Sequence, residues 1–218
     1  MDQGTTAATA AKTVRGAKPF AITSAVCALA MVALGIPFAG GTGPGGFDRV
    51  FEGWVATVFG GQAELLRLFV VATQPYVLIP VLAVVAIACG LARRGPELAV
   101  TLAGPAIAVA LNTWVLKPLF DRHNGGAYAY PSGHTVSLVS TLAVLVIVAR
   151  PGAATWLTAA LAVLLVPFAA VGMVGLGFHY LTDVIGGTLF AIAFVLATRL
   201  AGLAYFRRHP WPARLSRP

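Results

Sequence analysis

Residues 70–91 read VVATQPYVLIPVLAVVAIACGL, a stretch that contains no charged side chain. An α-helix needs about 20 apolar residues to cross a hydrocarbon core of ~30 Å, so this stretch predicts a transmembrane helix. Further apolar runs lie at Phe20–Phe38, Leu98–Leu116, Val136–Val148, Trp156–Leu176 and Leu181–Tyr205. We therefore expect an all-α membrane protein with six transmembrane helices, located in the cell membrane as a multi-pass protein.

The composition supports a membrane protein. Of 218 residues, 58% are hydrophobic and 10% are charged, whereas a soluble domain carries about a quarter charged residues. The formal net charge is +8, but the basic residues sit in short clusters between apolar runs and form no stripe of the kind that binds nucleic acid. We therefore expect no nucleic acid partner. The sequence does not indicate an oligomeric state.

The two ends of the chain are polar. Residues 1–18 have no apolar period and predict a disordered cytoplasmic tail, and residues 207–218 predict a basic cytoplasmic tail. The six-helix domain would then occupy residues 19–206. The first apolar run could also be a signal peptide, but it is long for that purpose and is followed by a weak cleavage site, so a retained first span is favoured.

An amphipathic segment follows the first span. A glycine-rich loop at residues 40–46 precedes apolar side chains spaced as one helical face, and Asp48, Arg49 and Glu52 fall on the other face. The apolar face consists of Phe47, Val50, Phe51, Trp54, Val55, Val58 and Phe59. This pattern predicts a helix in the membrane interface, with a short helix packed on the bundle as the alternative.

The distribution of Lys and Arg predicts the orientation. If the N-terminus is cytoplasmic, ten basic residues fall on the inner side and Arg49, Arg67, Lys117 and Arg122 fall on the outer side. Cytoplasmic loops retain Lys and Arg, so both termini are expected inside. The inner residues are Lys12, Arg15, Lys18, Arg93, Arg94, Arg150, Arg207, Arg208, Arg214 and Arg217.

Ionisable residues at the ends of spans are candidates for function, and here they gather in two stretches on the predicted outer side. One stretch runs from Lys117 to His134, and the other from His179 to Asp183. His179 and Asp183 are four residues apart and share a helical face, so the carboxylate can orient the imidazole and leave its other nitrogen as a nucleophile.

The segment Pro131-Ser132-Gly133-His134 opens the fourth apolar run. The free N–H groups at a helix N-terminus form a site for a phosphate oxyanion. His134 would stand beside that anion, where it could protonate a departing oxygen, while Lys117 and Arg122 supply positive charge.

These residues resemble the motifs of the type 2 phosphatidic acid phosphatase (PAP2) superfamily, the histidine-nucleophile lipid phosphatases. The Pro-Ser-Gly-His motif is intact at residues 131–134, and the His-x3-Asp pair is present as His179 and Asp183. The resemblance covers about residues 47–205. It implies that His179 attacks phosphorus to form a phosphohistidine, that Asp183 orients His179, and that His134 is the general acid.

The same resemblance implies that Lys117, Arg122, Ser132 and Gly133 hold the phosphate and that neither a metal nor another cofactor is needed. His123, Asn124 and Tyr130 are further candidates for the site.

Two positions depart from the family pattern. Asn124 stands where the first-motif arginine belongs, although Arg122 matches an additional arginine of many members. Gly172 and Met173 stand where the third motif has Ser-Arg. Loss of one charge-assisted contact to a transition state can cost about 10²–10³ in rate. These departures fit a specialised substrate, a donor supplied from elsewhere such as His123, or a weakened enzyme.

We expect hydrolysis of a lipid phosphate or polyprenyl pyrophosphate at the outer face. Candidate substrates are undecaprenyl or decaprenyl pyrophosphate, phosphatidic acid and phosphatidylglycerophosphate. A phosphotransferase using an acceptor hydroxyl and a non-catalytic protein that binds lipid head groups remain alternatives. Three structural alternatives also remain. The histidines could be buried without a chemical role, and Lys117 and Arg122 could extend to the membrane interface only to be solvated. His123, His134, His179 and Asp183 could also bind zinc.

Overall fold

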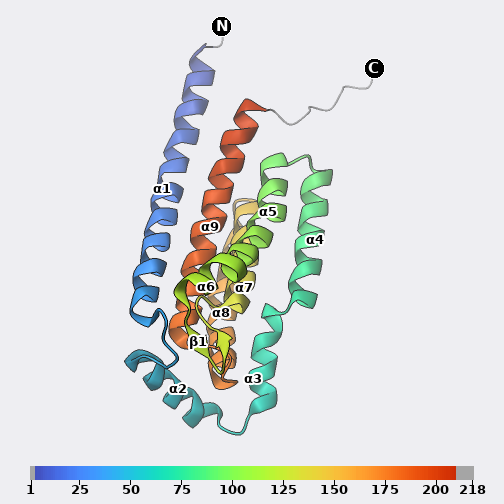
Figure 1. Ribbon diagram of the computed structural model, residues 1–218. Helices are drawn as coiled ribbons and strands as arrows, with labels where there is room; N and C mark the ends of the chain where they lie inside the picture. Colours follow the sequence, from blue (N-terminus) through green and yellow to red (C-terminus); the bar gives the residue numbers. More distant parts are fainter. Residues whose placement is uncertain (1–2, 210–218) are drawn as a thin grey trace.

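The computed structural model describes residues 3–209, and for residues 3–16 it describes the backbone only. Its long helices run side by side as a bundle (Figure 1). They are α1 (Gln3–Gly35), α4 (Pro75–Leu91), α5 (Gly95–Leu111), α7 (Gly133–Val148), α8 (Ala153–Gly175) and α9 (Leu181–Arg208). Shorter helices are α2 (Gly46–Phe59), α3 (Ala63–Val70) and α6 (Lys117–Phe120), and 3-10 turns occupy Ile36–Phe38 and Val71–Thr73.

Within residues 3–209, five helical segments are long and apolar enough to cross a membrane. They are Ala17–Phe38, Ala63–Leu91, Gly95–Phe120, Ala153–Gly175 and Leu181–Arg208. Helix α7 is apolar but shorter, with 16 residues. At 1.5 Å per residue it covers about 24 Å, somewhat less than the hydrocarbon core. A multi-pass, mostly helical membrane protein is thus confirmed, and the sixth span stays a prediction.

Large apolar side chains cover the outside of the bundle. Leu29, Ile79 and Leu91 are exposed by 71%, 64% and 78%. Such a surface suits a lipid environment, because a soluble protein rarely exposes large contiguous apolar patches.

The predicted second span is interrupted. Helix α3 ends at Val70, a 3-10 turn follows, and α4 begins at Pro75. Pro75 lacks a backbone N–H and disfavours helical geometry at the preceding residue, and Gln74 is indeed extended at φ −79° and ψ 143°. The third span is longer than predicted, because a π-helical turn at Asn112–Leu116 joins α5 to α6.

Helix α1 extends through residues 3–18, where the sequence predicts a disordered tail. Several of these residues are alanines, which have the highest helix propensity, and extending an existing helix avoids the cost of nucleation. At the other end, α9 reaches Arg208, and residues 210–218 of the predicted basic tail lie outside the described residues. The division into one domain and two tails stays a prediction.

Helix α2 lies across the end of the bundle opposite to the start of α1 and the end of α9 (Figure 1). Phe47, Val50 and Trp54 on α2 are exposed, whereas Asp48 and Val55 are buried against the bundle. An exposed apolar face is what a helix at a membrane interface requires. The interfacial position itself stays a prediction.

Glycines in α9 allow the α7 entry loop to pack closely. A methyl group on Gly187 would lie 2.7 Å from the carbonyl oxygen of Ser132, and one on Gly186 would collide with the ring of Tyr130. The backbone N–H of Ser132 donates to the carbonyl oxygen of Asp183 at 3.0 Å. The tips of α7 and α9 are therefore held together at one end of the bundle.

Candidate active site

The two stretches of ionisable residues meet at this end of the bundle. The ring centroids of His134, in the first turn of α7, and His179, two residues before α9, are 5.8 Å apart. His134 also stacks on Phe178 at 6.1 Å. The expectation that the two histidines lie close together is confirmed.

Asp183 lies next to His179. Its Oδ2 is 3.7 Å from Nδ1 of His179, beyond the usual hydrogen-bond distance, and Nδ1 has no other partner within the described residues. The same Oδ2 accepts the backbone N–H of Tyr180 at 2.8 Å, so Asp183 caps its own helix. Since both side chains are buried, a modest movement of the imidazole would complete a charge-assisted hydrogen bond.

The histidines line a cavity of about 600 Å³. Its polar wall contains Lys117, Asn124, Gly133, His134, Ser137 and His179. Pro75 of α4, Val109 of α5 and Phe178 contribute apolar surface. The cavity therefore combines groups that could bind an anion with surface that could contact an apolar chain.

Lys117 is the one Lys or Arg among the described residues that line this cavity. Its Nζ donates a hydrogen bond of 2.7 Å to the carbonyl oxygen of Tyr128. Tyr128 lies in a small hairpin formed by β1 (His123–Asn124) and β2 (Ala127–Tyr128), in which His123 pairs with Tyr128. The hairpin thus places the ammonium group at the cavity wall.

Ser132 does not face the cavity. It is fully buried, and its Oγ accepts the backbone N–H of Thr135 at 3.3 Å as the N-cap of α7. Met173 packs against the same hydroxyl, with Sδ at 3.7 Å. The capping role leaves the N–H groups of Gly133 and His134 as the free donors of the first turn.

Asn112 supports this turn from the π-helical segment. It is fully buried, and its Nδ2 donates to the carbonyl oxygen of Pro131 at 3.3 Å. The extra residue of a π-helical turn changes which side chains face inward, and such turns are frequent at functional sites. No local sequence pattern indicates this contact, which joins residues 19 positions apart.

Arg122 is placed differently from the prediction. It is fully buried, does not line the cavity, and forms ion pairs with Asp183 at 2.7 Å and with Asp48 at 3.0 Å. Its guanidinium lies over the rings of Phe38 and Tyr180, at 4.2 and 4.5 Å. This position does not support the predicted contact with phosphate, because both terminal nitrogens already bind carboxylates and Nε, which has no partner among the described residues, is buried away from the cavity.

Asp48 was not among the predicted site residues. It is fully buried in α2, and its carboxylate accepts hydrogen bonds from both the N–H and the hydroxyl of Thr182 at 2.9 Å. Burial raises the pKa of Asp48, but hydrogen bonds from Thr182, Gly45 and Arg122 outweigh burial, so the pKa lies below its usual value. From the sequence, an acidic residue in the first turn of a helix after a glycine-rich loop indicates that it stabilises its own helix N-terminus. The sequence pattern does not indicate that Asp48 also binds a residue in α9.

Of the three further candidate residues, one lines the cavity and two do not. Asn124 lines the cavity and donates from Nδ2 to the carbonyl oxygen of Gly177 at 3.1 Å. His123 does not line it, and its ring contacts that of Tyr128 in a tilted arrangement, with the centroids 4.7 Å apart. Tyr130 is fully buried and donates its hydroxyl to the carbonyl oxygen of Met31, which places it in the core.

Within the described residues, no three His, Cys, Asp or Glu side chains gather in a way that could hold a metal ion. The expectation that the site needs no metal stays a prediction.

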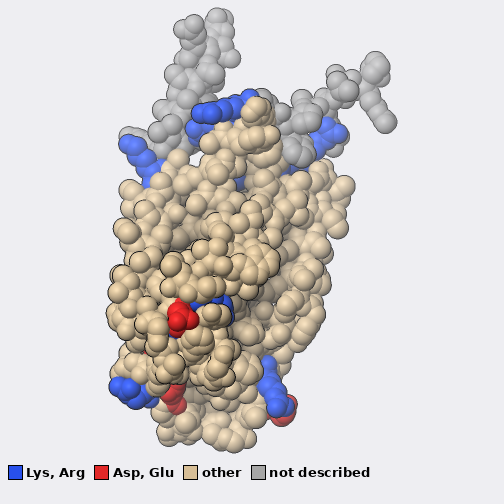
Figure 2. Space-filling model, viewed as in Figure 1, with Lys and Arg blue, Asp and Glu red and all other residues tan. Residues whose placement is uncertain are grey.

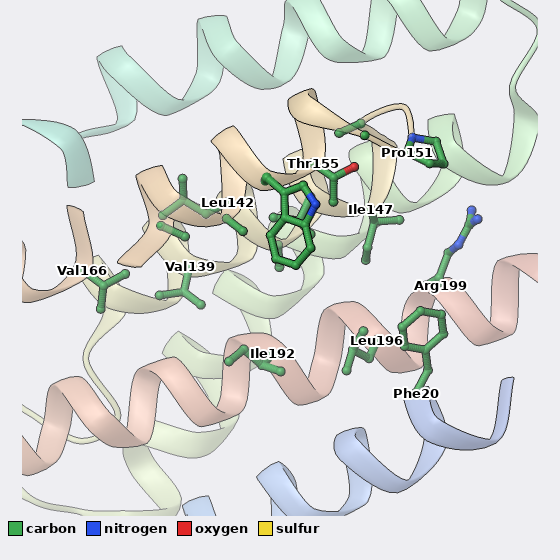
Figure 3. Close-up of a pocket in the computed structure, with 17 residues that line it drawn as sticks. Phe20, Val139, Leu142, Ile147, Pro151, Thr155, Val166, Ile192, Leu196 and Arg199 are labelled. Atoms are coloured by element: carbon green, nitrogen blue, oxygen red, sulfur yellow. The ribbon is translucent and has the colours of Figure 1, made fainter. Parts of the chain in front are cut away.

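A second cavity, of about 660 Å³, lies between α1, α7, α8 and α9 (Figure 3). Its wall is almost entirely apolar, with Trp156 and Leu196 among its members and Arg199 as the one charged residue. Among the described residues, neither a histidine nor a carboxylate lines this cavity.

The fold and the first cavity define a polytopic membrane protein with a paired-histidine site at the ends of its helices. The family model of the PAP2 superfamily matches residues 76–206, more than half of the chain. The chain therefore belongs to the PAP2 superfamily, and this membership indicates phosphatase activity on phosphate esters. The match begins after α2, so it does not include Asp48. No curated protein and no solved structure matches the chain.

Proposed function

We propose that the protein hydrolyses a lipid phosphate or a polyprenyl pyrophosphate through a phosphohistidine intermediate. The proposal rests on His134 and His179, whose ring centroids are 5.8 Å apart. Both residues line the same cavity as Lys117. A phosphoryl group between the two rings could be attacked by one and protonated by the other.

In the first step, Nε2 of His179 attacks phosphorus while the bond from phosphorus to the leaving oxygen breaks. Asp183 faces Nδ1 of His179 and would stabilise the positive charge that develops on the ring. His134 would give a proton to the leaving oxygen. In the second step, water attacks phosphorus, the P–N bond breaks, and His134 takes the proton of that water.

The phosphoryl oxygens would be held by the free N–H groups of Gly133 and His134 and by Lys117. Ser132 would act indirectly, because its hydroxyl caps α7. Pro75 and Val109 bring apolar surface from two bundle helices into the cavity, which supports a substrate with an apolar tail.

We place the site on the extracytoplasmic side. Lys and Arg are more numerous at the end of the bundle where α1 begins and α9 ends than at the end that carries α2 (Figure 2). The positive-inside rule makes that end cytoplasmic, and the cavity lies at the other end.

The test uses the purified protein in detergent with a panel of lipid phosphomonoesters and polyprenyl pyrophosphates. We expect release of inorganic phosphate from at least one lipid, and no release by His179→Ala. The phosphoenzyme trapped by acid-free quenching should be stable in alkali and labile in acid, as a phosphohistidine is. Full activity of His179→Ala would refute the proposed mechanism.

Product analysis with and without an acceptor alcohol separates hydrolysis from phosphotransfer. Transfer to the alcohol as the main reaction would favour the phosphotransferase. Binding of lipid without any turnover by the wild-type protein would favour a non-catalytic role.

A further inference from the structure

We propose that Asp48 and Arg122 are positioning residues that link helix α2 to the carboxylate beside His179. This inference rests on the proposed function, because Asp183 needs to be oriented only if His179 reacts. It connects α2, which lies outside the family match, to the carboxylate that orients His179.

Each terminal nitrogen of Arg122 is engaged. Nη1 donates to Oδ1 of Asp183 at 2.7 Å and to Oγ1 of Thr182 at 2.6 Å. Nη2 donates to Oδ2 of Asp48 at 3.0 Å and to the carbonyl oxygen of Gly43 at 3.3 Å. The guanidinium is therefore fixed between two carboxylates and has no terminal donor left for a ligand.

Asp48 is fixed equally firmly. Its Oδ1 accepts the N–H of Thr182, and its Oδ2 accepts from Arg122, from the hydroxyl of Thr182 and from the N–H of Gly45. These contacts join the start of α2 to the start of α9, although Asp48 and Thr182 are 134 residues apart. The first turn of α9, which carries Asp183, is held by α2.

The division of Arg122 between two acids determines how Asp183 is presented. Because Nη2 is bound to Asp48, Arg122 holds Asp183 through Oδ1 alone, and Oδ2 is left facing Nδ1 of His179. A guanidinium without a second partner prefers a bidentate pair with a carboxylate. Without Asp48, Arg122 would compete with His179 for Oδ2.

The burial of Arg122 separates this role from phosphate binding. The residue is fully buried, is absent from the cavity wall, and is covered on its faces by Phe38 and Tyr180. Lys117 does line the cavity. Variants of Arg122 should therefore lower kcat, whereas variants of Lys117 should raise KM and the inhibition constant of inorganic phosphate.

The experiment compares Asp48→Asn and Arg122→Lys with the wild type and with Arg49→Gln, an exposed neighbour on α2 that serves as the matched control. It measures kcat and KM for phosphate release, and the inhibition constant of inorganic phosphate. We expect kcat to fall by about 10- to 100-fold in both variants, because a small misplacement of a reacting group has this effect. KM and the inhibition constant should stay within about twofold.

Asp48→Glu keeps the charge and should restore part of the lost kcat, which a loss of packing alone would not predict. If Asp48→Asn does not fold, Asp48→Glu takes its place in the comparison. Arg122→Lys tests the positioning role independently of both Asp48 variants. Unchanged kcat in a folded variant would overturn the proposal, as would a higher phosphate inhibition constant with unchanged kcat.

Failure of the proposed function has a different signature. In that case the wild type and Arg49→Gln would release no more phosphate than His179→Ala from any lipid, and the positioning role would fall with it. If only the positioning role is wrong, the wild type and the Asp48 and Arg122 variants remain equally active, whereas His179→Ala is inactive.

Discussion

The backbone N–H of Ser132 donates to the carbonyl oxygen of Asp183 at 3.0 Å, so the entry to α7 is bonded directly to the first turn of α9. Helix α7 carries His134 and the proposed anion-binding turn, and α9 begins two residues after His179. Their close approach depends on Gly187, where any side chain would meet the carbonyl oxygen of Ser132.

Gly187→Ala should therefore separate the two helix tips. The added methyl group would lie 2.7 Å from backbone, which cannot move as a flexible side chain can. We expect kcat to fall by about 100-fold, since a misplacement of about 1 Å can cost that much. The matched control is Gly90→Ala in α4, where a methyl group meets open space, and its kcat should not change. Equal activity of the two variants would contradict this prediction.

Lys117→Met should weaken the binding of phosphate. Lys117 provides the positive charge at the cavity wall, so its loss should raise KM and the inhibition constant of inorganic phosphate by about tenfold or more. Lys117→Arg should keep most of the affinity. Measurement of inhibition by phosphate across these variants checks the prediction, and unchanged inhibition in Lys117→Met would exclude contact between this side chain and the anion.

Met173→Arg should not create a more active enzyme, although the family pattern has arginine at this position. Met173 is fully buried and packs against the hydroxyls of Ser132 and Thr135. An arginine there would be a buried charge without a partner, with a penalty of several kcal/mol. We expect a lower melting temperature in detergent and lower phosphate release, with Met173→Leu as the volume-conserving control. A gain in activity would show that position 173 can reach the phosphate.

The proposed orientation predicts the accessibility of two exposed positions. A cysteine at Ala127 in the hairpin should react with an impermeant thiol reagent on intact cells, whereas one at Ala153, the first residue of α8, should react only after permeabilisation. The native Cys27 and Cys89 are replaced first, to remove background labelling. The reverse pattern would invert the topology.

Local patterns were sufficient to predict the helical bundle and the meeting of His134 with His179. Apolar run lengths predict the spans, and the placement of both motifs at span ends on one side predicts that they meet. The break at Val71–Gln74 differs from the prediction, because the uncharged Thr73 and Gln74 were included in a run that was defined by its lack of charged side chains.

The partner of Arg122 could not be predicted from sequence. Arg122 lies close to Lys117 and His134 in the chain, so the motif suggested phosphate as its ligand. The competing ligand, Asp48, is 74 residues away, in a segment whose pattern predicts a helix in the membrane interface or one packed on the bundle. Only the packing of α2 against α9 brings this carboxylate to the guanidinium, and no local periodicity records that contact.

The bond between Asp48 and Thr182 has a consequence for biogenesis. During synthesis, Asp48 emerges from the ribosome long before its partner residue in α9 exists. Arg122, the ion-pair partner of Asp48, is also synthesised before α9, but the N–H and the hydroxyl of Thr182 are not yet there to bind the carboxylate. The contacts that join α2 to α9 can therefore form only after the last helix has been synthesised, so this end of the bundle is completed last.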